Sequence, residues 1–106
     1  MTLKAKWVNN PEKYEELSKP FENRQEAEKA IKAFMRAVSK LREKHRIADV
    51  VVVIKGSFMD PENSDKKLEY MYHTQNGHAL NGLPMAGFLL GKMKEQHNEI
   101  VDQLKA

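Results

Sequence analysis

The sequence contains no cysteine, only one tryptophan among 106 residues, and no apolar run of the roughly 18 residues that would suggest a membrane span. Without cysteine the chain forms no disulfide, binds no metal through thiolates and has no cysteine nucleophile. The first eight residues lack the apolar core of a secretory signal peptide, so we expect a cytoplasmic protein that does not associate with membranes.

The composition is that of a globular protein, with 41% hydrophobic and 31% charged residues. The length favours a single domain over residues 1–106, which would bury about two-thirds of its unfolded surface. The net charge of +3 is unevenly distributed, because residues 1–46 are basic and residues 47–106 are slightly acidic. A basic half is typical of proteins with an anionic partner, but it also occurs without one.

Capping residues mark two helices in the first half of the sequence. Asn10 followed by Pro11 is typical of a helix start and predicts a short helix over residues 12–17. Asn23 predicts the N-cap of a longer helix over residues 23–46. One face of that longer segment carries apolar residues at helical spacing: Ala27, Ala30, Ile31, Phe34, Met35, Val38 and Leu41.

Two strands and a final helix are expected in the second half. The five consecutive β-branched residues 50–54 favour a strand, and residues 66–74 alternate between two faces as a second strand does. A loop around residues 59–66 would join them into a β-hairpin. The last helix is expected over residues 83–103, with an apolar stripe formed by Ala86, Leu89, Leu90, Met93, Ile100, Val101 and Leu104.

The predicted fold class is therefore α+β, a β-hairpin packed with two long helices in the order (β)ααββα. The bracketed strand is a weakly alternating segment at residues 3–8, which would make the antiparallel sheet three-stranded. The strand at residues 50–54 does not alternate, so we expect both of its faces to be covered. The N-terminal segment, one of the helices or another copy of the chain would cover the second face, and the sequence leaves these three alternatives open.

Two features suggest nucleic acid as a candidate partner, although the sequence does not favour it. A basic face of the first long helix consists of Lys29, Lys32, Arg36, Lys40 and Lys44. Such a face is typical of phosphate-binding helices, but it is more often the solvated side of an amphipathic helix. Tyr70 and Tyr72, beside residues 55–58, are similar to a base-stacking platform, whereas core tyrosines with hydroxyls at the rim are the simpler interpretation.

A polar loop between the second strand and the last helix is a candidate ligand or partner site: His73, Gln75, Asn76, Gly77 and His78. Two histidines five residues apart are typical of an acid–base pair or of part of a metal site, but a metal needs further ligands, and Asp49 or Glu69 would have to approach in the fold. Residues 77–82 have the glycine spacing of a phosphate-binding loop. Leu83 and Pro84 then replace the required Lys and Ser/Thr, which excludes that type of nucleotide hydrolysis. The sequence predicts no metal and no cofactor.

The start of the last helix is apolar on nearly every side and contains two glycines. Each mid-helix glycine costs about 1 kcal/mol relative to alanine, and close approach of another backbone would offset that cost. That backbone belongs either to the chain's own sheet or to a partner's helix. The candidate self-association residues are Gly87, Phe88, Leu90 and Gly91. His97, on the apolar stripe, is expected to be a hydrogen-bonded boundary residue.

Three functions remain open on this reasoning. The leading hypothesis is a small non-enzymatic binding or regulatory protein that acts through protein–protein contacts as a homo-oligomer. The alternative is a nucleic-acid or nucleotide-binding protein that uses the basic helix face or the loop at residues 73–82. A weaker alternative is a small histidine-dependent hydrolase.

Overall fold

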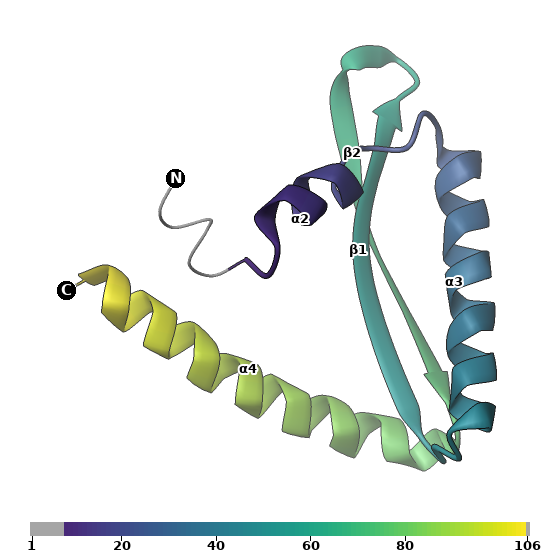
Figure 1. The fold of residues 1–106 in the computed structure, drawn as a ribbon, viewed down its shortest axis with the longest axis vertical. Helices are drawn as coiled ribbons and strands as arrows, with labels where there is room; N and C mark the ends of the chain where they lie inside the picture. Colours follow the sequence, from purple (N-terminus) through teal and green to yellow (C-terminus); the bar gives the residue numbers. More distant parts are fainter. Residues whose placement is uncertain (1–7, 106) are drawn as a thin grey trace. The chain divides into compact units, whose positions relative to one another are not determined.

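The computed structural model describes residues 8–105. The elements follow one another as α2 (Pro11–Leu17), α3 (Arg24–Lys44), β1 (Val50–Asp60), β2 (Asn63–Asn76), the short 3-10 helix η1 (Ala79–Asn81) and α4 (Gly82–Lys105) (Figure 1). This is the predicted α+β class in the predicted order of helices and hairpin strands. The strand expected at residues 3–8 lies, except for Val8, outside the described residues.

Both predicted helix starts are confirmed, and each is held by an asparagine side chain. Asn10 Oδ1 accepts a hydrogen bond from the backbone N–H of Lys13 at 3.3 Å. Asn23 Oδ1 accepts one from the backbone N–H of Glu26 at 2.9 Å. The helix α3 ends two residues earlier than predicted, because Arg46 adopts a left-handed conformation with φ of 56° that reverses the chain.

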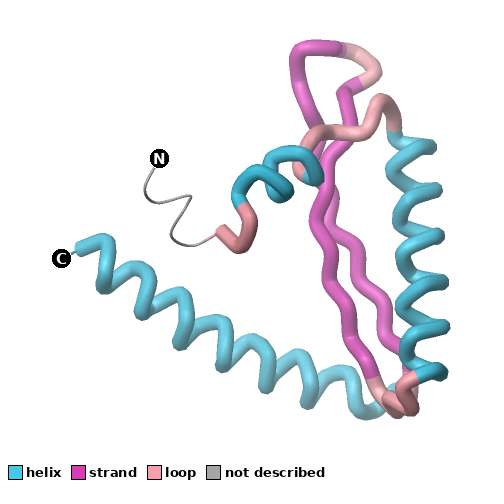
Figure 2. The backbone as a smooth tube through the Cα atoms, in the orientation of Figure 1, coloured by secondary structure: helices cyan, strands magenta, loops and turns pink. Residues whose placement is uncertain are grey.

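The hairpin strands are longer than the sequence predicts. β1 continues to Asp60 and β2 begins at Asn63, so the loop expected at residues 59–66 is a short turn (Figure 2). Asp60 Oδ1 accepts a hydrogen bond from the backbone N–H of Glu62 at 2.9 Å, which stabilises that turn. Residues 65–67 are charged, so the alternation of apolar residues that predicts a strand is absent there. They still form part of β2, because strands pair through backbone hydrogen bonds, which do not require apolar side chains.

The first of two compact units comprises the described part of Met1–Ala37 together with Ile54–Tyr72. Phe21 pairs in parallel with Phe58: its N–H donates to the Ser57 carbonyl at 2.9 Å, and its carbonyl accepts from the Met59 N–H at 2.9 Å. The rings of Phe58 and Tyr70 stack with centroids 6.2 Å apart. Ala27, which is 2% exposed, is the one hydrophobic residue that the described part of the chain buries.

The second unit comprises Val38–Val53 together with His73–Ala106, described as far as residue 105. Val50 lines a hollow with Val38 and Leu41 of α3. Successive residues of a strand point to opposite faces, so Val51 and Val53 lie on the other face, beside α4. Val53 remains 61% exposed, so α4 lines this face without closing over it. The N-terminal segment lies outside the described residues apart from Val8, and coverage of this face by that segment or by another copy stays a prediction.

The division into two units does not decide whether the chain is one domain, and that expectation stays a prediction. The strands β1 and β2 and the helix α3 each contribute residues to both units. None of the described helices combines the length and the apolar content that crossing a bilayer demands.

Candidate functional site

A polar junction fixes the start of α4 to the residue that precedes β1. The two carboxylate oxygens of Asp49 accept hydrogen bonds from the backbone N–H of His78 at 2.8 Å and from the side-chain amide of Asn81 at 3.1 Å. His78 Nδ1 accepts a hydrogen bond from the backbone N–H of Leu80 at 3.1 Å and so caps η1. Asp49, which the sequence offered only as a distant metal ligand, therefore acts as an acceptor for amide groups.

Glycine and glutamine complete this junction. Gln75 Nε2 donates to the carbonyl oxygens of His78 and Ala79 at 2.9 and 3.1 Å. Gly77 has φ of +123°, and a Cβ on it would lie 2.6 Å from the Ala48 carbonyl oxygen. Glycine is therefore required at this position both for its backbone conformation and for the close approach of the neighbouring chain.

The predicted loop site thus has a structural role in the described chain. Gln75 and His78 use their side chains within the junction. His73, Gln75 and Asn76 belong to β2, which continues to Asn76, and not to a loop as predicted. Within residues 8–105 no three His, Asp or Glu side chains are grouped so as to hold a metal ion. The other acid considered for this loop, Glu69, forms an ion pair with Lys55 at 3.4 Å. A ligand role for the loop stays a prediction.

Beside the junction lies an apolar groove, which we call the β1–α4 groove. Its volume is about 590 Å³, and it is lined by Val51, Val53, Pro84, Met85, Ala86, Phe88, Leu89, Leu90 and Met93. No lining residue carries a charge or a side-chain hydrogen-bond donor. Phe88 is 70% exposed, and Leu90 and Met93 are each more than half exposed. The groove is therefore an open apolar surface.

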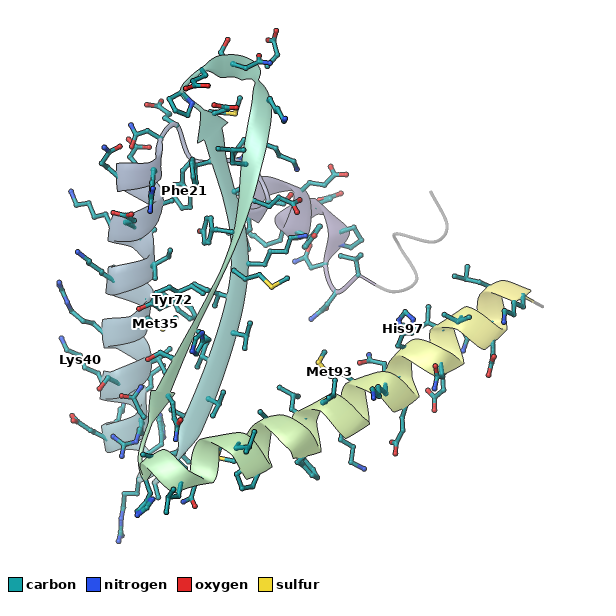
Figure 3. All side chains as sticks on the ribbon, turned by 180° about the vertical axis from the view of Figure 1, so that it is seen from behind. Phe21, Met35, Lys40, Tyr72, Met93 and His97 are labelled. Atoms are coloured by element: carbon teal, nitrogen blue, oxygen red, sulfur yellow. The ribbon has the colours of Figure 1, made fainter. Side chains whose placement is uncertain are left out.

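The structure separates the four predicted self-association residues into two groups. Phe88 and Leu90 line the β1–α4 groove. Gly87 and Gly91 do not line it, and a Cβ built on either glycine would meet no atom within 4 Å outside the neighbouring backbone of α4. The part of the sheet in the second unit therefore does not pack against these glycines. Further along α4, Met93 and His97 project from the same side of the helix (Figure 3).

A second groove, of about 630 Å³, lies in the first unit between α3 and β2. Its floor is apolar and includes Ile31 and Phe58, and both Tyr70 and Tyr72 line it. On its charged rim, Arg24 Nε donates to Glu28 at 3.0 Å. The tyrosines therefore belong to a half-covered apolar surface, with Tyr72 46% exposed, and both interpretations of this pair stay predictions.

The predicted basic face is fully formed. The five exposed residues make no side-chain hydrogen bond or ion pair within the described part of the chain: Lys29, Lys32, Arg36, Lys40 and Lys44. Lys40 projects away from the hairpin (Figure 3). The nearby acid Glu28 is engaged by Arg24, so it does not pair with these side chains.

Comparison with known proteins yields no relative. No protein-family model, no curated protein and no solved structure matches the chain. The case for a function therefore depends on the geometry of the β1–α4 groove, the polar junction beside it and the basic face of α3.

Proposed function

We propose that this chain is a small non-enzymatic binding or regulatory protein of the cytoplasm that acts through protein–protein contacts as a homo-oligomer. The observation that carries the proposal is the β1–α4 groove, where apolar side chains of α4 lie beside Val51 and Val53 without being covered. Soluble monomers rarely expose a contiguous apolar surface of this kind unless a partner binds there.

The energetics support association through this surface. Burying one Val, Leu, Met or Phe side chain completely contributes about 1.5–3 kcal/mol. Val53, Phe88, Leu89, Leu90 and Met93 each have about half or more of their surface left to bury. Together they can offset a cost of association of about 4–15 kcal/mol.

The polar junction supports the same proposal. The first turn of α4 is held next to the start of β1 by Asp49, His78 and Asn81. The two walls of the groove, β1 and α4, therefore keep a fixed spacing at the end nearest the junction. These contacts set the geometry to which a partner has to be complementary.

Sedimentation velocity of the wild-type chain over a concentration series tests this proposal. We expect an oligomer at micromolar concentration that dissociates on dilution. Because apolar burial drives this association, raising the salt concentration should not weaken it. A chain that remains monomeric at high micromolar concentration would contradict the proposed homo-oligomer.

A nucleic-acid-binding function is the second candidate, and the observation that favours it is the unpaired basic face of α3. Phosphate contacts release counterions, so binding through this face would weaken steeply with salt. Replacing Lys32, Arg36 and Lys40 together by glutamine should abolish such binding and leave the fold intact, because these side chains are exposed. We expect wild-type binding to be weak or absent at physiological salt, and tight binding that is lost in the triple variant would reverse the ranking.

A further inference from the structure

A repeat of three and four residues runs along one side of α4. Its members are Leu83, Ala86, Leu90, Met93, His97, Ile100 and Leu104, which we call the α4 seam. Apolar residues spaced in this way keep to one face of a helix and are typical of a helix that pairs with another in a coiled coil. The α4 seam extends over about 31 Å of helix axis.

The α4 seam is open to a partner. Leu83 is 84% exposed, and Leu90, Met93 and Leu104 are each more than half exposed. Three of the seam residues, Ala86, Leu90 and Met93, also line the β1–α4 groove. A second helix laid on the seam would therefore enter the groove and cover Val51 and Val53 of β1 as well.

We propose that the α4 helix of a second copy of this chain occupies the β1–α4 groove and the α4 seam, so that the chain folds and dimerises in one equilibrium. This inference rests on the proposed homo-oligomer and names its interface. It assigns the uncovered face of the 50–54 strand to the partner copy.

The apolar surface left open within the second unit supports a second copy as the occupant. Leu83, Phe88, Leu90 and Met93 of α4 are each more than half exposed, as is Val53 of β1. A two-fold dimer would bury this surface on both copies at once.

The distribution of charge also favours self-pairing. No seam position carries a charged residue, and the charged residues of α4 lie elsewhere on the helix: Lys92, Lys94, Glu95, Glu99, Asp102 and Lys105. Two copies can therefore bring their seams together without burying like charges. A two-fold dimer uses the same patch on both copies, and an uncharged apolar seam is complementary to itself.

The apolar face of α3 has a similar spacing but is half-covered within the chain, where Ile31 and Phe34 line a hollow with Phe21 and Tyr70. His97 is the one polar residue of the α4 seam, and a single polar residue at such a position specifies the register and the number of helices.

A lysine placed in the seam tests the interface against a matched control. Met93→Lys buries a charge between the two helices, whereas Asn98→Lys adds the same charge to the same helix away from the seam. Sedimentation equilibrium should show at least a tenfold weaker dimer for Met93→Lys and little change for Asn98→Lys. Equal weakening by both variants would contradict the seam.

Thiol labelling provides a second test, because the chain has no cysteine of its own. Leu90→Cys places one thiol in the seam and Glu95→Cys places one on the opposite side of α4. Maleimide should label the seam cysteine many-fold more slowly at concentrations where the dimer forms than after dilution, while the other cysteine reacts equally fast at both. Equal rates for the two cysteines in a dimeric sample would overturn the inference.

The same series separates the inference from the proposed function. Gly91 lies roughly 130° around the helix from the centre of the seam, so Gly91→Leu should leave the dimer intact. If Gly91→Leu abolishes the dimer and Met93→Lys does not, the glycine side of α4 is the interface. The seam is then overturned, while the proposed homo-oligomer stands.

Thermal melts at several protein concentrations test whether folding and dimerisation are coupled. Coupled folding and dimerisation require a Tm that rises with protein concentration. A dimer whose Tm is independent of concentration, and whose dissociated chains remain folded by circular dichroism, would overturn the coupling. A wild-type chain that never dimerises would overturn both the inference and the proposed function.

Discussion

Asp49 accepts a hydrogen bond from the backbone N–H of His78 at 2.8 Å, across 29 residues of sequence. Its other oxygen accepts from Asn81, so one carboxylate fixes both the turn after β2 and the residue before α4. The start of α4 is therefore held in place by the side chain of Asp49, which lies outside both β2 and α4.

Replacing Asp49 by alanine should destabilise the fold. The substitution removes two charge-assisted hydrogen bonds, and hydrogen bonds to charged groups contribute about 1.5–3 kcal/mol. Because Asp49 is only half-buried, we expect a loss of about 2 kcal/mol in the free energy of unfolding, measured by urea denaturation. Asp102→Ala, an equal charge change near the exposed end of α4, is the control, and an equal loss there would show that the junction is not the cause.

Replacing Gly77 and Gly87 by alanine should have opposite effects on the stability of the protein. Gly77→Ala introduces a Cβ at positive φ against the Ala48 carbonyl and should lower Tm markedly. Gly87→Ala meets open space within a helix and should increase helix stability by about 1 kcal/mol. Thermal melts of the two variants beside the wild type measure both effects, and a tolerated Gly77→Ala would refute the described turn.

The stacked pair Phe58 and Tyr70 should stabilise the first unit. Tyr70→Ala removes the ring that packs over Gly56 and against Phe58, at a cost of about 2–3 kcal/mol for a half-buried aromatic side chain. Tyr70→Phe keeps the ring and should cost much less. Chemical denaturation of both variants distinguishes loss of the ring from loss of the hydroxyl, and similar costs would show that the hydroxyl matters most.

Chelation should leave the protein folded. The described residues provide no cluster of three metal-ligating side chains, and the sequence has no cysteine ligands. Melting curves with and without a strong chelator should therefore coincide. A drop of several degrees on adding chelator would reveal a structural metal.

Local signals in the sequence predict much of this fold. The caps at Asn10 and Asn23 are each defined by residues three positions away, so the sequence places both helix starts correctly. The five β-branched residues likewise mark the start of β1. The end of β1 and the start of β2 are not predictable in this way, because the charged residues near the hairpin turn pair through the backbone alone.

The candidate site is less predictable, because it depends on contacts between distant residues. Nothing in the sequence near His78 indicates that Asp49 accepts a hydrogen bond from it. The exposure of Val53 cannot be predicted from the sequence either, since β-branched residues indicate a strand without indicating what covers each of its faces. The apolar stripe of α4 is visible in the sequence, but only the structure shows Leu90 and Met93 in an open groove with β1.

The uncovered face of β1 has a kinetic consequence for a newly made chain. Residues 50–54 form an uncharged run of β-branched residues without proline, and such segments stack readily with copies of themselves into cross-β aggregates. Val51 and Val53 lie on the open face of that run until something covers them. In the proposed dimer, covering this face competes with stacking between chains, so we expect the yield of refolding from denaturant to depend on how quickly the dimer forms.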